Sequence, residues 1–113
     1  MTTKVAVLGA GAWGLTLADL LCRKGASVVV WDCDAPKIER LRETRVPGKP
    51  PGLQLSPAIR LETALGPTLA EAEVIVSVVP SFAIQEVCRA IIDLGGLGSR
   101  CFISCSKGIT EDL

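Results

Sequence analysis

The chain of 113 residues contains no histidine, and none of its five cysteines belongs to a Cys-x-x-Cys pair. Histidine is the commonest partner of cysteine at zinc sites, so we predict that the chain holds no metal ion. Because the sequence shows no sign of export, the five thiols are expected to be reduced and mostly buried.

An excess of charge of either sign is also missing. Twelve basic residues balance twelve acidic ones, and neither kind is gathered into a long block. Proteins that bind nucleic acid or a membrane surface carry a basic patch. We therefore expect neither of these partners, and expect a small molecule or another protein instead.

Long apolar runs are absent, although 49% of the residues are hydrophobic. Each run is broken well before the roughly 18 residues needed to cross a bilayer. Residues 1–24 superficially resemble a signal peptide, but three glycines interrupt them and no small-residue cleavage site follows. We expect a soluble, cytoplasmic protein with one domain over residues 1–113, which buries roughly 65% of the surface exposed by its unfolded chain.

What is present is an alternation of strand and helix patterns. Short runs rich in β-branched residues predict strands at residues 4–9, 27–31, 58–61, 74–79 and 101–105. Helical periodicity and capping residues predict helices that begin near Trp13, Asp34, Glu62 and Ser81, the third interrupted by Gly66-Pro67. Residues 45–57 hold four of the seven prolines, so we expect no regular element there. This order predicts the α/β class, a Rossmann-type doubly wound parallel sheet with strand order 3-2-1-4-5.

The apolar faces of two helices can also be predicted from periodicity. For the first helix the predicted face consists of Trp13, Leu17, Leu20 and Leu21. For the last helix it consists of Ile84, Val87, Cys88 and Ile91. Lys24-Gly25 is predicted to end the first helix, and Gly95-Gly96 the last one.

The turn between the first strand and the first helix has the sequence Gly9-Ala10-Gly11-Ala12-Trp13-Gly14, which is a G-x-G-x-x-G motif. Such a motif is informative here because it follows a strand, opens a helix and lies within a βαβ unit of about 30 residues. Gly9 suits a tight turn, Gly11 lets the backbone approach a pyrophosphate, and Gly14 allows close contact between helix and sheet. The motif predicts dinucleotide binding.

Two aspartates follow the second strand, and we assign them different roles. Asp32 stands at the carboxyl end of the strand, where a carboxylate can accept hydrogen bonds from the adenosine ribose hydroxyls and repel a 2′-phosphate. Asp34 precedes Ala35-Pro36 and is expected to cap the next helix. The alternative is that Asp32 also serves only as a cap. Asp32 favours NAD as the cofactor, with NADP as the other candidate.

The string Gly-Ala-Gly-Ala-Trp-Gly at residues 9–14 resembles the cofactor fingerprint of the NAD(P)-dependent sn-glycerol-3-phosphate dehydrogenases, since few other families place tryptophan between the last two glycines. Three further stretches resemble family landmarks in the same order: Arg42-Glu43-Thr44-Arg45 with Pro47-Gly48, then Val79-Pro80-Ser81, then Ser106-Lys107-Gly108-Ile109. The likeness covers essentially the whole chain, as the N-terminal dinucleotide-binding domain of such an enzyme.

The resemblance implies hydride transfer between the nicotinamide ring and glycerol 3-phosphate or dihydroxyacetone phosphate, in glycerophospholipid synthesis. It implies a substrate contact by Lys107, the catalytic candidate, which from its position alone would be a solvated loop lysine. It implies cofactor contacts by Gly9, Gly11, Ala12, Trp13, Gly14, Asp32, Cys33, Pro80, Phe82 and Lys107.

Three departures from the family pattern qualify these expectations. Asp32-Cys33 stands where many bacterial members carry an arginine that pairs with the 2′-phosphate of NADP. Phe82 stands where many members have histidine, so a hydrogen bond made by that histidine is lost. The loop before Pro47-Gly48 is shorter than the family pattern.

Two other classes of function compete with this interpretation. Ketopantoate reductases and nucleotide-sugar dehydrogenases share the glycine fingerprint, but Trp13 and Ser-Lys-Gly-Ile argue against them. A non-catalytic dinucleotide sensor would need no second domain.

The last residues of the sequence predict the start of a further helix, because Thr110 can cap it and Glu111 and Asp112 would lie in its first turn, just before Leu113. We therefore expect a fragment that binds cofactor without turnover, because the acid/base lysine, the phosphate-binding residues and any homo-oligomer contacts would belong to a helical second domain.

Overall fold

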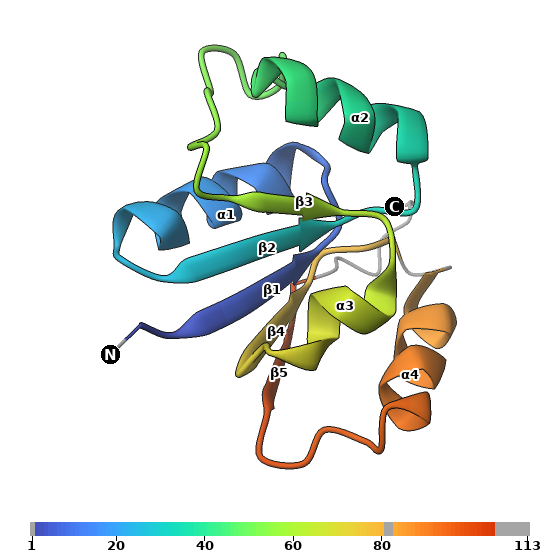
Figure 1. Ribbon diagram of the computed structural model, residues 1–113. Coiled ribbons are helices and arrows are strands. Elements are labelled where there is room, and N and C mark those ends of the chain that lie inside the picture. The colour runs from blue at the N-terminus through green and yellow to red at the C-terminus, as the bar shows by residue number, and fades with distance from the viewer. Residues whose placement is uncertain (1, 81–82, 106–113) are drawn as a thin grey trace.

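A computed structural model describes residues 2–80 and 83–105 (Figure 1). Strands and helices alternate along this part of the chain, as predicted. The elements are β1 (Lys4–Leu8), α1 (Ala12–Arg23), β2 (Ser27–Trp31), α2 (Ala35–Thr44), β3 (Arg60–Glu62), α3 (Leu65–Ala70), β4 (Val74–Ser77), α4 (Ile84–Asp93) and β5 (Cys101–Ser104).

The strands form one parallel sheet in the order β3-β2-β1-β4-β5, which confirms the predicted Rossmann-type order. The central strand β1 pairs with β2 from Lys4↔Ser27 to Leu8↔Trp31. On its other side it pairs with β4, up to Leu8↔Ser77. The carboxyl ends of the three central strands therefore lie side by side at one edge of the sheet.

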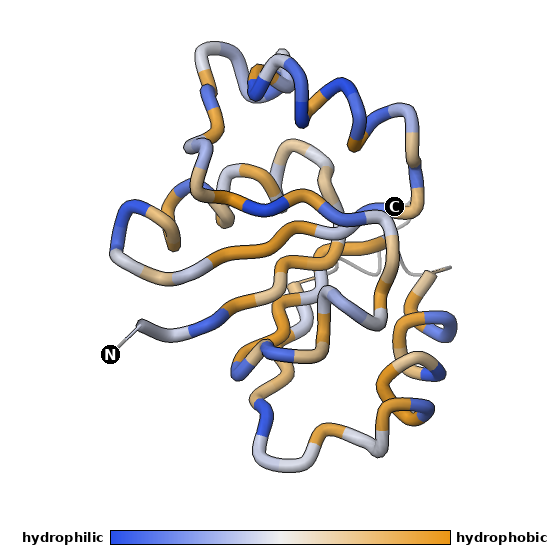
Figure 2. The backbone as a smooth tube through the Cα atoms, in the orientation of Figure 1, coloured by the Kyte–Doolittle hydropathy of each residue, from blue (hydrophilic) through white to orange (hydrophobic). Residues whose placement is uncertain are grey.

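Helices cover both faces of the sheet: α1 and α2 lie on one face, α3 and α4 on the other (Figure 1). Val5 and Val7 of β1 pack toward the first pair of helices, and Ala6 and Leu8 toward the second. A strand buried on both faces has no polar alternation. This explains the nearly continuous hydrophobic colouring of the central strands in Figure 2.

The predicted helix ends are confirmed where the chain has an explicit capping residue. The Asp34 side chain accepts a hydrogen bond from the amide of Lys37 at 3.1 Å and caps α2. Gly25 follows α1 with φ of 98°, and Gly95 follows α4 with φ of 96°. Both glycines have left-handed backbone conformations that favour glycine over other residues.

The predicted faces of α1 and α4 are wrong in part. Trp13 is 55% exposed and Leu20 is 49% exposed, while the residues of α1 buried against the sheet are Gly14, Leu15 and Ala18. In α4, Val87 and Ile91 are buried as predicted, but Cys88 is exposed. The apolar stripe on each helix is wider than the area that the sheet covers. Periodicity therefore predicts burial for some residues that lie beside the contact between helix and sheet.

The third helix and third strand begin later than predicted. β3 spans Arg60–Glu62 in place of residues 58–61, and α3 spans Leu65–Ala70 in place of an interrupted helix over 62–72. Gly66 and Pro67 do not interrupt α3, because they lie in its first turn. Proline is tolerated there, since the amide it lacks has no partner within the helix.

The expectation that the cysteines are mostly buried is also wrong. Cys33, Cys88 and Cys101 are exposed, and Cys22 and Cys105 are half-buried. All five are free thiols, as predicted.

The proline-rich segment between α2 and β3 has no helix or strand, as predicted. It is nevertheless anchored, because the Leu55 amide donates to the carbonyl of Arg45 at 2.7 Å and the Leu55 and Ile59 side chains are buried. The Arg45 guanidinium also donates to the carbonyl of Ser56 at 3.1 Å. These contacts hold residues 46–49 near the carboxyl edge of the sheet.

Replacing Gly14 by alanine should destabilise the protein by about 1–3 kcal/mol, as overpacking of a tight contact does. A Cβ atom at this position would collide with the carbonyl oxygen of Gly9, which is backbone and cannot rotate away. Gly11→Ala is the matched control, because its Cβ would meet no atom within 4 Å. It should change the free energy of unfolding by less than about 1 kcal/mol, since the loss of a glycine N-cap and the lower entropy of the unfolded chain oppose each other. Urea denaturation measures both, and equal losses would contradict the expected role of Gly14.

Candidate functional site

The site is built around the turn that joins β1 to α1. Gly9 has φ of 117°, and a Cβ on it would lie 2.9 Å from the carbonyl oxygen of Val78. Its amide donates to the carbonyl of Trp31 at 2.7 Å. The turn therefore sits directly against the ends of β2 and β4, and only glycine fits at position 9.

Gly11 differs from the other two glycines of the motif. It has φ of −76°, and a Cβ on it would meet nothing within 4 Å. Neither backbone conformation nor packing requires glycine there. The space beside Gly11 is open toward solvent, which leaves room for a ligand against the backbone.

The first amides of α1 border this open space. Among residues 2–80 and 83–105, the N–H groups of Gly11, Ala12 and Trp13 have no hydrogen-bond partner, and no side chain caps the helix. The N-terminus of a helix also carries a partial positive charge. Unpaired amides and the helix dipole together favour an anion beside Gly11.

Asp32 connects the end of β2 to this turn. Its Oδ2 accepts a hydrogen bond from the amide of Ala10 at 2.9 Å, and its Oδ1 accepts one from the amide of Asp34 at 2.9 Å. The ammonium of Lys37 lies 3.6 Å from Oδ2. The carboxylate thus holds the glycine turn in place from the position that was predicted for the ribose contact. The capping role belongs to Asp34, as predicted.

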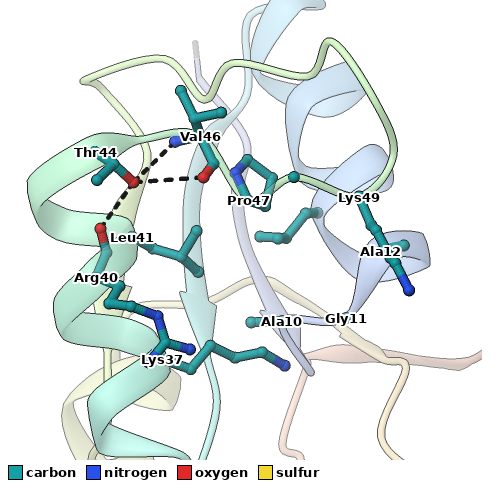
Figure 3. Close-up of a pocket in the computed structure, with 12 residues that line it drawn as sticks. Ala10, Gly11, Ala12, Lys37, Arg40, Leu41, Thr44, Val46, Pro47 and Lys49 are labelled. Carbon is teal, nitrogen blue, oxygen red and sulfur yellow. Dashed lines mark hydrogen bonds between the residues drawn. The ribbon is translucent and has the colours of Figure 1, made fainter.

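A pocket of about 580 Å³ lies beside the turn, between α1, α2 and residues 46–49 (Figure 3). Of the residues that the structure describes, three cationic side chains line it and no carboxylate does. Lys37 and Arg40 extend from α2, and Lys49 comes from the segment that follows this helix (Figure 3). The lining residues are Ala10, Gly11, Ala12, Leu15, Lys37, Arg40, Leu41, Thr44, Val46, Pro47, Gly48 and Lys49.

Two arginines hold α2 in the position that forms this pocket. Arg42 donates from Nε to the carbonyl of Leu61 at 3.1 Å and pairs with Glu39 at 2.7 Å. Arg45 anchors the segment that follows, as described above. This part of the predicted family landmark is therefore structural, because it fixes the distance between α2 and β3.

The other predicted site residues lie at the same edge of the sheet, where they are described. Trp13 is exposed in the first turn of α1, Cys33 is exposed directly after Asp32, and Pro80 is exposed beyond the end of β4. Phe82 and Lys107 lie outside the described residues. Sequence reasoning missed the three cations of the pocket. The three-residue spacing of Lys37 and Arg40 would have placed them on one helix face, but nothing local points to Lys49.

Two negative findings concern residues 2–80 and 83–105. Within them, no three metal-ligating side chains come close enough together to hold an ion. None of the helices found there is both long enough and apolar enough to cross a membrane.

Comparison with known proteins gives a consistent result. Residues 4–113 match the family described as NAD-dependent glycerol-3-phosphate dehydrogenase N-terminus. The glycerol-3-phosphate dehydrogenase [NAD(P)+] of Geobacter sulfurreducens is 36% identical over 113 residues, which are 99% of this chain and 33% of that protein. The enzyme of the same name from Xanthomonas euvesicatoria is 40% identical over 99 residues, 87% of this chain and 29% of that protein.

A solved structure supports the same grouping. The crystal structure of glycerol-3-phosphate dehydrogenase from Coxiella burnetii superposes with a TM-score of 0.86 at 28% identity, over 97% of this chain and 34% of that one. The chain spans about a third of the length of the curated relatives it matches. These matches favour the predicted family over ketopantoate reductases, nucleotide-sugar dehydrogenases and a sensor domain. The chain belongs to the family of the N-terminal domains of NAD-dependent glycerol-3-phosphate dehydrogenases.

Proposed function

We propose that this chain is the cofactor-binding domain of a glycerol-3-phosphate dehydrogenase, an oxidoreductase that interconverts sn-glycerol 3-phosphate and dihydroxyacetone phosphate for glycerophospholipid synthesis. The bound nicotinamide supplies or accepts the hydride. The observation that carries the proposal is the open, side-chain-free space at Gly11, bordered by three unpaired amides.

The pyrophosphate of the cofactor suits that space on energetic grounds. Hydrogen bonds from N–H groups to a charged acceptor contribute about 1.5–3 kcal/mol each, and the helix dipole adds about 0.3–1 kcal/mol. A methyl group at Gly11 would occupy the volume through which the phosphate approaches. The backbone of the turn therefore binds the cofactor, and the side chains around it orient the two ends.

The adenosine end is assigned to Asp32 and the neighbouring Cys33. The Asp32 carboxylate already accepts bonds from two amides, but each carboxylate oxygen can accept more than one hydrogen bond. It can thus accept from ribose hydroxyls without releasing the turn. The nicotinamide end is assigned to Pro80 and Phe82, beyond the end of β4, with Trp13 packing along the cofactor.

The substrate is assigned to Lys107, whose cationic side chain suits the oxygens of a phosphorylated three-carbon substrate. This assignment follows from the family resemblance and from the place of residue 107 after β5. The acid/base lysine and the residues that bind the substrate phosphate are expected outside residues 1–113, so we expect no turnover by this chain alone. The cytoplasmic location and a homo-oligomer of the full-length enzyme stay predictions.

Gly11→Ala should weaken NADH binding by at least about tenfold, which corresponds to one lost charge-assisted hydrogen bond. The measurement is a titration of the 113-residue chain with NADH, followed by quenching of tryptophan fluorescence and by calorimetry. Because the same variant should keep its stability, a loss of binding reports on the ligand site. If the unsubstituted chain shows no saturable binding, the proposed function is wrong.

Asp32→Ala should lower both the stability of the chain and its affinity for NADH. The buried amide of Ala10 would lose its partner, which costs about 1.5–3 kcal/mol. Glu71→Ala is the matched control, since it removes an exposed carboxylate paired with Lys4 at 3.8 Å, and should cost under about 1 kcal/mol. Urea denaturation and NADH titration provide the two readouts. Similar effects of the two substitutions would contradict the role given to Asp32.

A further inference from the structure

The cations of the pocket are more numerous than NAD binding requires. The amides of the turn suffice for a pyrophosphate, and the ribose of NAD carries no charge. Nevertheless Lys37 and Arg40 stand three residues apart on α2, and Lys49 faces them across the pocket (Figure 3). Because no carboxylate stands among the described residues that line the pocket, these side chains produce a positive potential next to the turn.

Two of the three cations have no partner. Among residues 2–80 and 83–105, the Arg40 guanidinium and the Lys49 ammonium form no hydrogen bond or ion pair, although Glu43 lies one helical turn beyond Arg40. The other acid of this helix, Glu39, is engaged by Arg42. Lys37 alone is paired, at 3.6 Å from Asp32. Arg40 is therefore available to a ligand.

The position of Lys37 relates this pocket to the ribose site. Its ammonium contacts Asp32, the residue assigned to the ribose hydroxyls, and its side chain lines the pocket. The pocket therefore begins beside the place where the adenosine ribose is expected, and Arg40 stands one turn further along α2. A substituent on the ribose 2′-hydroxyl would enter a region with three cations.

We propose that Arg40, assisted by Lys37, binds the 2′-phosphate of NADP(H), so that this chain takes NADPH in spite of Asp32. The inference rests on the proposed function. The Asp32 charge opposes a 2′-phosphate, but two amides and Lys37 already compensate it. The guanidinium of Arg40 presents two parallel N–H donors that can bond two phosphate oxygens, whereas an ammonium acts as a point charge. Arg40 would then determine cofactor specificity without belonging to the glycine motif.

The test compares NADPH and NADH binding to the 113-residue chain, to Arg40→Gln and to Arg89→Gln. Arg89 is exposed on α4, on the other face of the sheet, so its replacement removes the same charge elsewhere. We expect Arg40→Gln to weaken NADPH binding by about 10- to 100-fold and NADH binding by less than about twofold, and Arg89→Gln to change neither. Arg40→Lys should give an intermediate loss. Added salt should weaken NADPH binding more than NADH binding.

Three results would overturn the proposal. The unsubstituted chain could bind NADH but bind NADPH at least about 100-fold more weakly, which would leave the proposed function intact. Arg40→Gln could weaken the binding of both cofactors equally, which would mean that Arg40 contributes only a general electrostatic attraction. Inorganic phosphate could compete with NADPH equally well in the unsubstituted chain and in Arg40→Gln, which would place the phosphate away from Arg40. Failure to bind either cofactor would instead refute the proposed function itself.

Discussion

The carbonyl oxygen of Gly9 lies where a side chain at position 14 would begin, and this contact brings helix α1 directly onto the end of strand β1. Because the helix starts so close to the sheet, its first amides lie at the carboxyl edge, beside the ends of β2 and β4. The whole site depends on that approach. A larger residue at either position would move the amides away from the edge and separate them from Asp32.

Asp32 joins the two halves of the site. Through one carboxylate oxygen it holds the amide of Ala10, and through the other it holds the amide of Asp34 at the start of α2. The glycine turn and α2 are thereby oriented by one side chain. For this reason the cations of α2 lie next to the amides of α1, although Ala10 and Asp32 are 22 positions apart in the sequence. The proposed sites for a pyrophosphate at Gly11 and for a 2′-phosphate at Arg40 both depend on this arrangement.

The residues of the glycine motif could be predicted because their requirements are local. Glycine at a strand-to-helix junction indicates a special backbone conformation or a close approach of the helix to the strand, and both depend on a few neighbouring residues. The orientation of Trp13 could not be predicted, because hydrophobicity does not show how wide a stripe of α1 the sheet covers. The same reason applies to Cys88 on α4. Lys49 was missed since its place in the pocket depends on buried contacts of Leu55 and Ile59, further along the loop.

The sequence alone determined the order of strands and helices, the parallel sheet, the cap at Asp34 and the identity of the glycine turn. Each of these follows from periodicity, capping and glycine spacing within a few residues, which act before the chain is folded. Only the tertiary structure decided that Lys37, Arg40 and Lys49 share one pocket with Gly11, and that Asp32 holds the turn. Those relations come from packing between distant segments, and the packing of α2 and its loop on the sheet is set by the whole core.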